Sequence, residues 1–162
     1  MESGQLSFRY AQEEDAEKIL FFIRALAEYE KMEHDVVATP QLLKEWIFEK
    51  KKAEVIFPVV DGKEIGFALF FHNFSTFLGR AGLYLEDLFV KPDYRGKGYG
   101  TAMLAWLAKK AVDEDCARFE WVCLDWNEPA LKVYRRLGAQ PQNQWVIQRL
   151  TGQELQALAD SF

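Results

Sequence analysis

The stretch from residue 85 to residue 101 holds the residues whose types and spacing are best suited to chemistry. Gly96, Gly98 and Gly100 alternate with other residues between a strand-like segment and a helix-like one. Glycines allow a backbone to come close to a ligand, and the first turn of a helix offers unpaired N–H donors with a partial positive charge. Arg95 and Lys97 add formal positive charge. The combination predicts a cradle for phosphate oxygens.

Two familiar phosphate-binding loops do not fit this glycine pattern. A dinucleotide fingerprint that starts at Gly96 requires glycine at position 101, where Thr101 stands; one that starts at Gly98 requires glycine in place of Met103. A P-loop requires Gly-Lys-Ser/Thr after a four-residue gap, and the sequence has no such run. The loop therefore predicts a different phosphate-containing ligand.

Hydrophobic periodicity predicts the elements that precede the loop. After a strand over 6–10, a helix over 16–29 carries apolar residues at helical spacing. Thr39 followed by Pro40 is typical of the start of a second helix. Three strands, over 55–60, 65–74 and 82–90, should form an antiparallel meander, and Asp61-Gly62 is its first turn.

The second half of the chain continues as alternating helices and strands. We expect a helix over 100–112, a strand over 118–124, a helix over 128–137 that ends at Gly138, a strand over 144–150 and a helix from Thr151. The element order is then βααβββαβαβα, which defines an α/β chain with a mixed, mostly antiparallel sheet and helices on both faces. No linker interrupts it, so residues 1–162 are expected to form one domain.

Composition excludes several classes of protein. The formal net charge of −5 leaves no basic face for nucleic acid, and no apolar run is long enough for a membrane span. Cys116 and Cys123 form no CxxC motif, and His34 and His72 are far apart, so no metal site is expected. Reduced thiols and the absence of a signal-peptide pattern favour a cytoplasmic location.

The chain resembles the GNAT N-acetyltransferase superfamily over nearly its whole length. The family pattern Arg/Gln-x-x-Gly-x-Gly/Ala follows a strand that ends in Val-x-Pro; here Arg95-Gly96-Lys97-Gly98-Tyr99-Gly100 follows Val90-Lys91-Pro92. A second family motif is similar to residues 124–139. The resemblance implies the GNAT fold, acetyl-CoA as cosubstrate and no metal.

The resemblance also implies which residues contact the cofactor. In the family, the glycine loop binds the pyrophosphate, and the end of the preceding strand binds the pantetheine arm and acetyl carbonyl through its backbone. The implied contacts are Leu88, Phe89, Val90, Arg95, Gly96, Lys97, Gly98, Tyr99, Gly100, Thr101, Asn127 and Ala130.

Among GNAT members, the chain is most similar to the spermidine/spermine and thialysine acetyltransferases. The matching segments are residues 27–32, 84–87 and 125–127. This similarity implies transfer to a primary amine of a small cationic substrate, with Tyr29 and Glu30 lining the amine site, and a homodimer. Polyamine enzymes carry an acidic residue where residues 140–145 have none, which weakens the case for spermidine or spermine. Diamines, thialysine-like amino acids or another small primary amine remain open as substrates.

Two residues are expected to catalyse the transfer. Tyr134 occupies the position of the family tyrosine that protonates the departing thiolate. Glu86 is the predicted base, acting directly or through water, and also a substrate contact. Because side chains alternate between the two faces of a strand, Glu86 is expected on the face of Leu88 and Val90, and Asp87 on the opposite face.

Two other functions use the same scaffold. A protein or peptide N-acetyltransferase would need an open groove, for which the aromatic segment over 70–74 is the candidate wall. A non-catalytic acyl-CoA-binding module would not need Glu86 and Tyr134, so their presence favours an enzyme.

Overall fold

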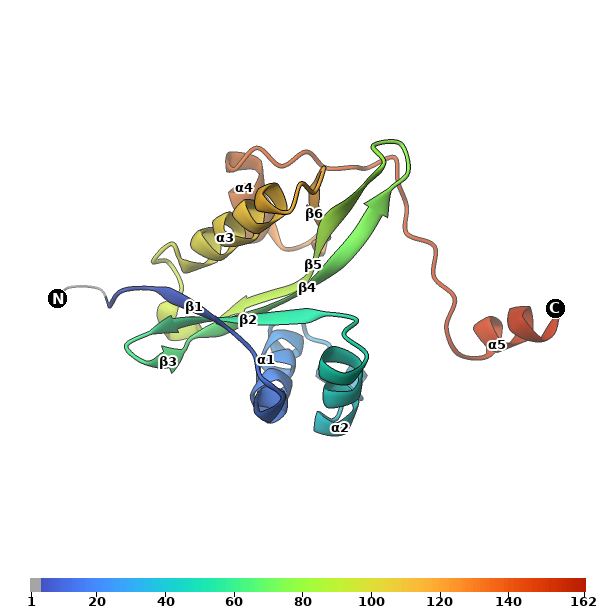
Figure 1. Cartoon of the computed structure of the whole chain (residues 1–162), viewed down its shortest axis with the longest axis horizontal. Coiled ribbons are helices and arrows are strands. Elements are labelled where there is room, and N and C mark those ends of the chain that lie inside the picture. The colour runs from blue at the N-terminus through green and yellow to red at the C-terminus, as the bar shows by residue number, and fades with distance from the viewer. Residues whose placement is uncertain (1–3) are drawn as a thin grey trace. The chain divides into compact units, whose positions relative to one another are not determined.

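A computed structural model describes residues 4–162 of the chain (Figure 1). The chain divides into two compact units. The first extends to Val122, and the second comprises Cys123–Phe162. Within the described residues, no helix combines the length and apolar character needed to cross a membrane.

The first unit is built on a six-stranded sheet whose strands follow the order β1-β2-β4-β5-β6, with β3 paired to β2. All pairs are antiparallel except β5 with β6, which is parallel. The strands are β1 (Ser7–Tyr10), β2 (Glu54–Val60), β3 (Lys63–Glu64), β4 (Gly66–Ser75), β5 (Arg80–Val90) and β6 (Phe119–Trp121). The mixed, mostly antiparallel sheet predicted from the sequence is confirmed.

Helices cover both faces of this sheet, as predicted. Figure 1 shows α1 (Ala16–Tyr29) and α2 (Pro40–Leu43) on one face and α3 (Tyr99–Asp113) on the other. Short helical turns lie at Glu13–Asp15, Glu33–Asp35, Lys44–Glu49 and Pro92–Tyr94. The apolar stripe of α1 packs on β2, β4 and β5 in a buried cluster of Ile19, Phe22, Ile47, Val55, Phe57, Phe67 and Phe89. This cluster fixes β5, the strand that leads into the glycine loop.

Local turn and cap signals are confirmed in the first unit. Asp61 and Gly62 both adopt positive φ in the turn between β2 and β3, as a two-residue hairpin requires. Thr39 caps the second helix by accepting a hydrogen bond from the Leu42 N–H at 3.2 Å, with Pro40 as its first residue. That helix is α-helical for only four residues and continues as a π-helix over Lys44–Glu49.

A bulge interrupts β5 in the middle of the predicted active strand. Leu69 lies opposite Asp87 and Phe70 opposite Leu85, so Glu86 has no partner on β4. One extra residue shifts the alternation of side chains by one. Leu85 and Leu88 therefore share one face, while Asp87 stays with Phe89 on the α1 face. The uninterrupted alternation assumed for 82–90 is wrong at Glu86.

The second unit contains α4 (Glu128–Arg136) and α5 (Gly152–Asp160). Gly138, at φ 92°, ends α4 as predicted. The N–H of Ala139 donates to the Tyr134 carbonyl and the N–H of Gly138 to that of Arg135, both at 3.0 Å, which is the Schellman arrangement. The strand predicted over 144–150 does not form: these residues are exposed and pair with no strand of residues 4–162.

Candidate active site

The glycine loop has the backbone geometry of an anion cradle. Gly96 and Gly98 adopt φ of +74° and +84°, and an added Cβ would meet nothing within 4 Å at either position. The conformation, not space, therefore requires glycine there. The first helical bond of α3 joins the Ala102 N–H to the Gly98 carbonyl at 3.0 Å. The N–H groups of residues 99–101 consequently have no acceptor within the helix and can face an anion.

Gly98→Ala is expected to destabilise the first unit and to weaken acetyl-CoA binding. A left-handed backbone costs a residue with a Cβ about 1–2 kcal/mol, and the cradle depends on that conformation. Gly100→Ala is the matched control, because Gly100 lies inside α3 without positive φ and an added Cβ meets nothing within 4 Å. Thermal unfolding and calorimetric titration with acetyl-CoA compare the two variants. Equal losses in both would contradict a conformational role for Gly98.

The strand before the loop presents an unpaired edge. Pairing with β6 ends where Leu85 lies opposite Trp121. Lys91 donates its N–H to the Ile65 carbonyl at 2.8 Å, on the β4 side. Because alternate residues of an antiparallel strand turn the same way, Leu88 and Val90 direct their N–H groups to the unpaired edge and Phe89 does not. This edge can bind an extended ligand through its backbone.

Arg95 is held against the protein rather than extended from the loop. Its Nε donates to the Val90 carbonyl at 2.9 Å. Its guanidinium lies 5.0 Å from the centre of the Tyr29 ring and 5.2 Å from that of Phe89. Arg95 therefore joins the loop to the end of α1, and Tyr29, a predicted amine contact, packs against a cation of the protein itself. Lys97 lies 5.7 Å from the Tyr94 ring, and both loop cations are exposed.

Two carboxylates of the first unit, Glu86 and Glu30, act on a third, Asp87, next to the bulge. Burial, and then the charges of Glu86 and Glu30, raise the pKa of Asp87 from 3.8 to about 7. Burial also raises the pKa of Glu30. The structure thus brings the predicted residues Glu30 and Glu86 into one acidic group with Asp87. Such a group attracts a cation and includes a carboxyl that titrates near neutral pH.

Asp87 is the site residue that sequence reasoning passed over. Strict alternation placed Asp87 and Glu86 on opposite faces, and the bulge that takes Glu86 out of this alternation is not visible in residue types. The sequence did carry one signal: a carboxylate within an apolar strand is costly to bury unless it is paired or protonated.

The remaining predicted site residues belong to the second unit. Asn127 immediately precedes α4 and makes no side-chain capping hydrogen bond; Ala130 lies in the first turn of the helix and Tyr134 in its last. All three side chains are partly buried, and the Schellman bonds at Gly138 fix the backbone at Tyr134. The roles of these three residues stay predictions.

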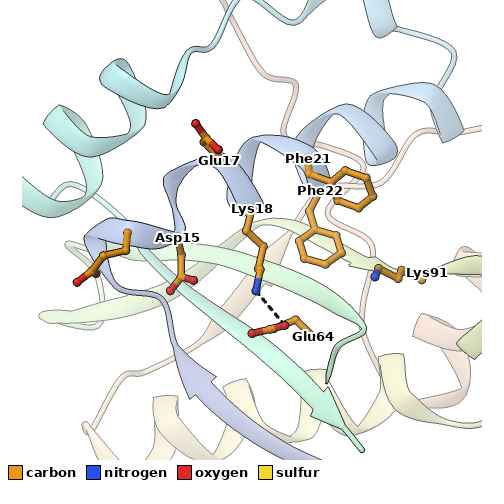
Figure 2. A pocket seen from close by; sticks show the side chains of 8 residues that line it. Asp15, Glu17, Lys18, Phe21, Phe22, Glu64 and Lys91 are labelled. Atoms are coloured by element: carbon orange, nitrogen blue, oxygen red, sulfur yellow. Dashed lines mark ion pairs between the residues drawn. The ribbon is translucent and has the colours of Figure 1, made fainter. Parts of the chain in front are cut away.

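A surface hollow of about 490 Å³ lies beside the first half of α1 (Figure 2). Three of its charged side chains form ion pairs: Lys18 contacts Glu64 at 3.0 Å, and Asp15 contacts Arg9 at 2.8 Å. Hydrogen bonding to Arg9 lowers the pKa of Asp15 to about 2. The hollow is lined by Glu14, Asp15, Glu17, Lys18, Phe21, Phe22, Glu64 and Lys91. None of these was predicted to take part in acetyl transfer.

The aromatic segment of β4 gives the peptide-acetylating alternative no support. Phe70 is fully buried, and Phe71 packs on Tyr84 with ring centres 5.1 Å apart. Only His72 and Phe74 of residues 70–74 are exposed. Side-chain exposure in this segment alternates as in any strand, and most of its side chains pack within the protein.

The fold and the cradle define a coenzyme A-dependent acyltransferase: a glycine-rich helix start follows a bulged strand with an open edge. The sequence profile of the acetyltransferase (GNAT) family matches residues 9–139. The chain belongs to this family and is an acetyltransferase, and acetyl-CoA is the family's cosubstrate.

Individual relatives agree with this assignment. The chain is 35% identical to a thialysine N-epsilon-acetyltransferase of Mus musculus, over 93% of this chain and 95% of that enzyme. It is 45% identical to an L-ornithine N5-acetyltransferase of Arabidopsis thaliana, over 57% of this chain but only 41% of that enzyme. An integron cassette protein from the mobile metagenome of V. cholerae has a similar structure, with a TM-score of 0.79, 28% identity, and 95% and 97% of the two chains covered.

Proposed function

We propose that this acetyltransferase moves the acetyl group of acetyl-CoA onto a primary amine of a small cationic substrate, by direct attack of the amine. The observation that carries the proposal is the acidic group of Glu30, Glu86 and Asp87, at the bulge where the unpaired edge of β5 begins. Its negative charge favours a cationic substrate, and the edge can bind the acyl donor.

The substrate amine must lose a proton before it attacks. A lysine-type amine has a pKa of about 10.4 and arrives as ammonium at neutral pH. Asp87, with a pKa of about 7, is suited to take that proton, because a general base works best when its pKa is near the operating pH. Glu86, predicted as the base, remains in the proposal as the charged neighbour that raises the pKa of Asp87 and attracts the ammonium.

Attack on the thioester carbonyl gives a tetrahedral oxyanion. The N–H groups of Leu88 and Val90 at the unpaired edge are the donors we assign to the acetyl group and its oxyanion. Collapse breaks the C–S bond, and the CoA thiolate leaves. Tyr134 is proposed to protonate this thiolate, on the strength of its place in the second family motif. No covalent enzyme intermediate is required.

Among small amines, we place amino acids with a side-chain amine before polyamines. The thialysine and ornithine enzymes above are named for acceptors of that kind. Residues 140–145 lack the acid that polyamine enzymes are expected to carry. Diamines stay within the proposed class.

A thiol-release assay with acetyl-CoA tests the proposal on thialysine, ornithine, lysine, putrescine, spermidine, spermine and N-terminal peptides. Turnover on one of the small amines, with at least tenfold lower kcat/KM on peptides, is expected. Preference for peptides would favour the protein-acetylating alternative. Bound acetyl-CoA without turnover on any amine would favour the non-catalytic module.

We also propose that the enzyme is a cytoplasmic homodimer. Trp145, Val146 and Ile147 are 79%, 73% and 63% exposed in a segment that was predicted to be a strand. Apolar side chains on an unpaired extended segment gain stability when a second copy covers them. The cytoplasmic location rests on the prediction from the sequence that Cys116 and Cys123 are reduced, as in a reducing compartment.

Ile147→Asp is expected to convert the dimer to a monomer, because burying a charge in an apolar contact is costly. Light scattering coupled to gel filtration measures the mass. Val37→Asp is the control, since Val37 is 82% exposed in the first unit and is given no role in the contact. A wild-type protein of single-chain mass at micromolar concentration would overturn the dimer.

A further inference from the structure

A histidine, a glutamate and a cysteine meet in the first unit, outside the proposed transfer site. His72 is on β4, Glu114 caps the end of α3, and Cys116 follows two residues later. The imidazole nitrogen, carboxylate oxygen and sulfur that they offer all lie within 4.8 Å of one another. The acetyl-transfer proposal uses none of these three residues.

The end of α3 holds Glu114 and Cys116 in defined positions. The Cys116 N–H donates to the Ala111 carbonyl at 2.9 Å, and the Asp115 N–H to the Val112 carbonyl at 3.1 Å. Asp115 is left-handed at φ 57°. These are the bonds of a Schellman motif. The backbone that carries two of the three side chains is therefore fixed before any ligand binds.

Strand β5 fixes the third side chain relative to these two. His72 lies opposite Leu83 in the β4–β5 ladder. The residue after Cys116, Ala117, donates its N–H to the Ala81 carbonyl of β5 at 3.1 Å. His72 and the segment that carries Cys116 are thus attached to β5 at Leu83 and Ala81, which are two residues apart on that strand.

The polar contacts in the cluster suit a bound cation. His72 Nε2 lies 2.7 Å from Glu114 Oε2, and Lys110 Nζ lies 2.6 Å from Glu114 Oε1. One carboxylate oxygen of Glu114 therefore faces the cluster while Lys110 orients the other, as partners of a metal ligand commonly do.

We propose that His72, Glu114 and Cys116 form a binding site for a zinc ion, with water completing a tetrahedron. Zinc takes nitrogen, oxygen and thiolate ligands at about 2.0–2.3 Å, so its ligand atoms lie roughly 3.3–3.8 Å apart. The three atoms need to shift by about 1 Å or less from their present separations to meet that spacing. The ion displaces the Cys116 thiol proton, which passes to solvent. The His72 and Glu114 side chains are 39% and 34% exposed, so an ion can enter.

The sequence predicted no metal site because such sites are recognised in a sequence by ligand residues at short, regular spacing. His72 and Glu114 are 42 residues apart, and no paired motif connects them. The site exists only where β4 passes the end of α3. It joins these two elements, so zinc is expected to stabilise the first unit by mass action.

Cobalt titration of the metal-free full-length protein tests the site directly. One Co²⁺ per chain is expected, with a thiolate-to-cobalt charge-transfer band and tetrahedral d–d bands that zinc abolishes by competition. Cys116→Ser should remove the charge-transfer band, and His72→Gln should weaken zinc binding about tenfold or more. The matched controls, Cys123→Ser and His34→Gln, should keep both properties.

Alkylation of the wild-type protein provides a readout that does not depend on the folding of any variant. Zinc should slow iodoacetamide labelling of Cys116, mapped by peptide mass, and leave Cys123 unchanged. Absence of the cobalt band, loss of binding in the control variants to the same degree, or equal protection of both cysteines would each overturn the site.

Discussion

Tyr134→Phe is expected to lower turnover about 100-fold or more while acetyl-CoA binding is retained, because a positioned acid typically contributes 10²–10⁴-fold. The phenol oxygen is the only atom removed, so the packing of α4 and the Schellman bond to the Tyr134 carbonyl remain. Stopped-assay kcat values and calorimetric titration with acetyl-CoA separate chemistry from binding.

Tyr10→Phe is the matched control for this loss. Tyr10 lies on β1 and packs against Trp106 at a ring-centre distance of 5.8 Å, so its phenol has no part in the proposed chemistry. The control should keep the wild-type kcat. If Tyr134→Phe also kept it, the thiolate would have to gain its proton from water or from another residue.

Asp87→Asn is expected to lower kcat/KM by about 10²-fold or more at neutral pH, because the amine would have to lose its proton without a base. In the wild-type enzyme, kcat/KM should rise with pH and level off above about 7, the pKa of Asp87. The variant should lack that inflection. A pH–rate profile measures both effects.

Glu86→Gln distinguishes the two carboxylates that share the bulge. The charge of Glu86 raises the pKa of Asp87, so its removal should move the inflection to lower pH and leave the base in place. If Glu86→Gln removed the inflection and Asp87→Asn preserved it, the base would be Glu86, as the sequence alone predicted.

Folding stability gives an independent measure of the Asp87 pKa. The ordinary pKa is 3.8 and the folded value about 7, so between these values the folded protein binds more protons than the unfolded chain. The contribution of Asp87 to the free energy of unfolding is therefore largest below about pH 4 and falls as pH rises to about 7. Asp87→Asn should abolish this part of the pH dependence. Denaturant unfolding at pH 5 and pH 8 measures it without reference to activity.

Features that depend on a few neighbouring residues could be predicted from the sequence. The Asp61-Gly62 turn, the Thr39-Pro40 helix start and the glycine end of α4 at Gly138 all have the expected conformation. Each rests on backbone freedom or on a hydrogen bond within one turn of chain, which residue types alone decide. The alternating glycines at the start of α3 are also a local feature, so the phosphate cradle and the family could be predicted from the sequence as well.

Features that depend on distant pairing required the tertiary structure. The bulge at Glu86 arises where ten residues of β4 meet eleven of β5, and it takes Glu86 out of the regular alternation of the strand. The segment 144–150 has the composition of a strand, but a strand also needs a partner, and residues 4–162 supply none. His72 and Cys116 meet because β4 and the end of α3 both attach to β5. Side-chain type sets what a residue can do, whereas burial, charge and partners contributed by remote segments decide what it does.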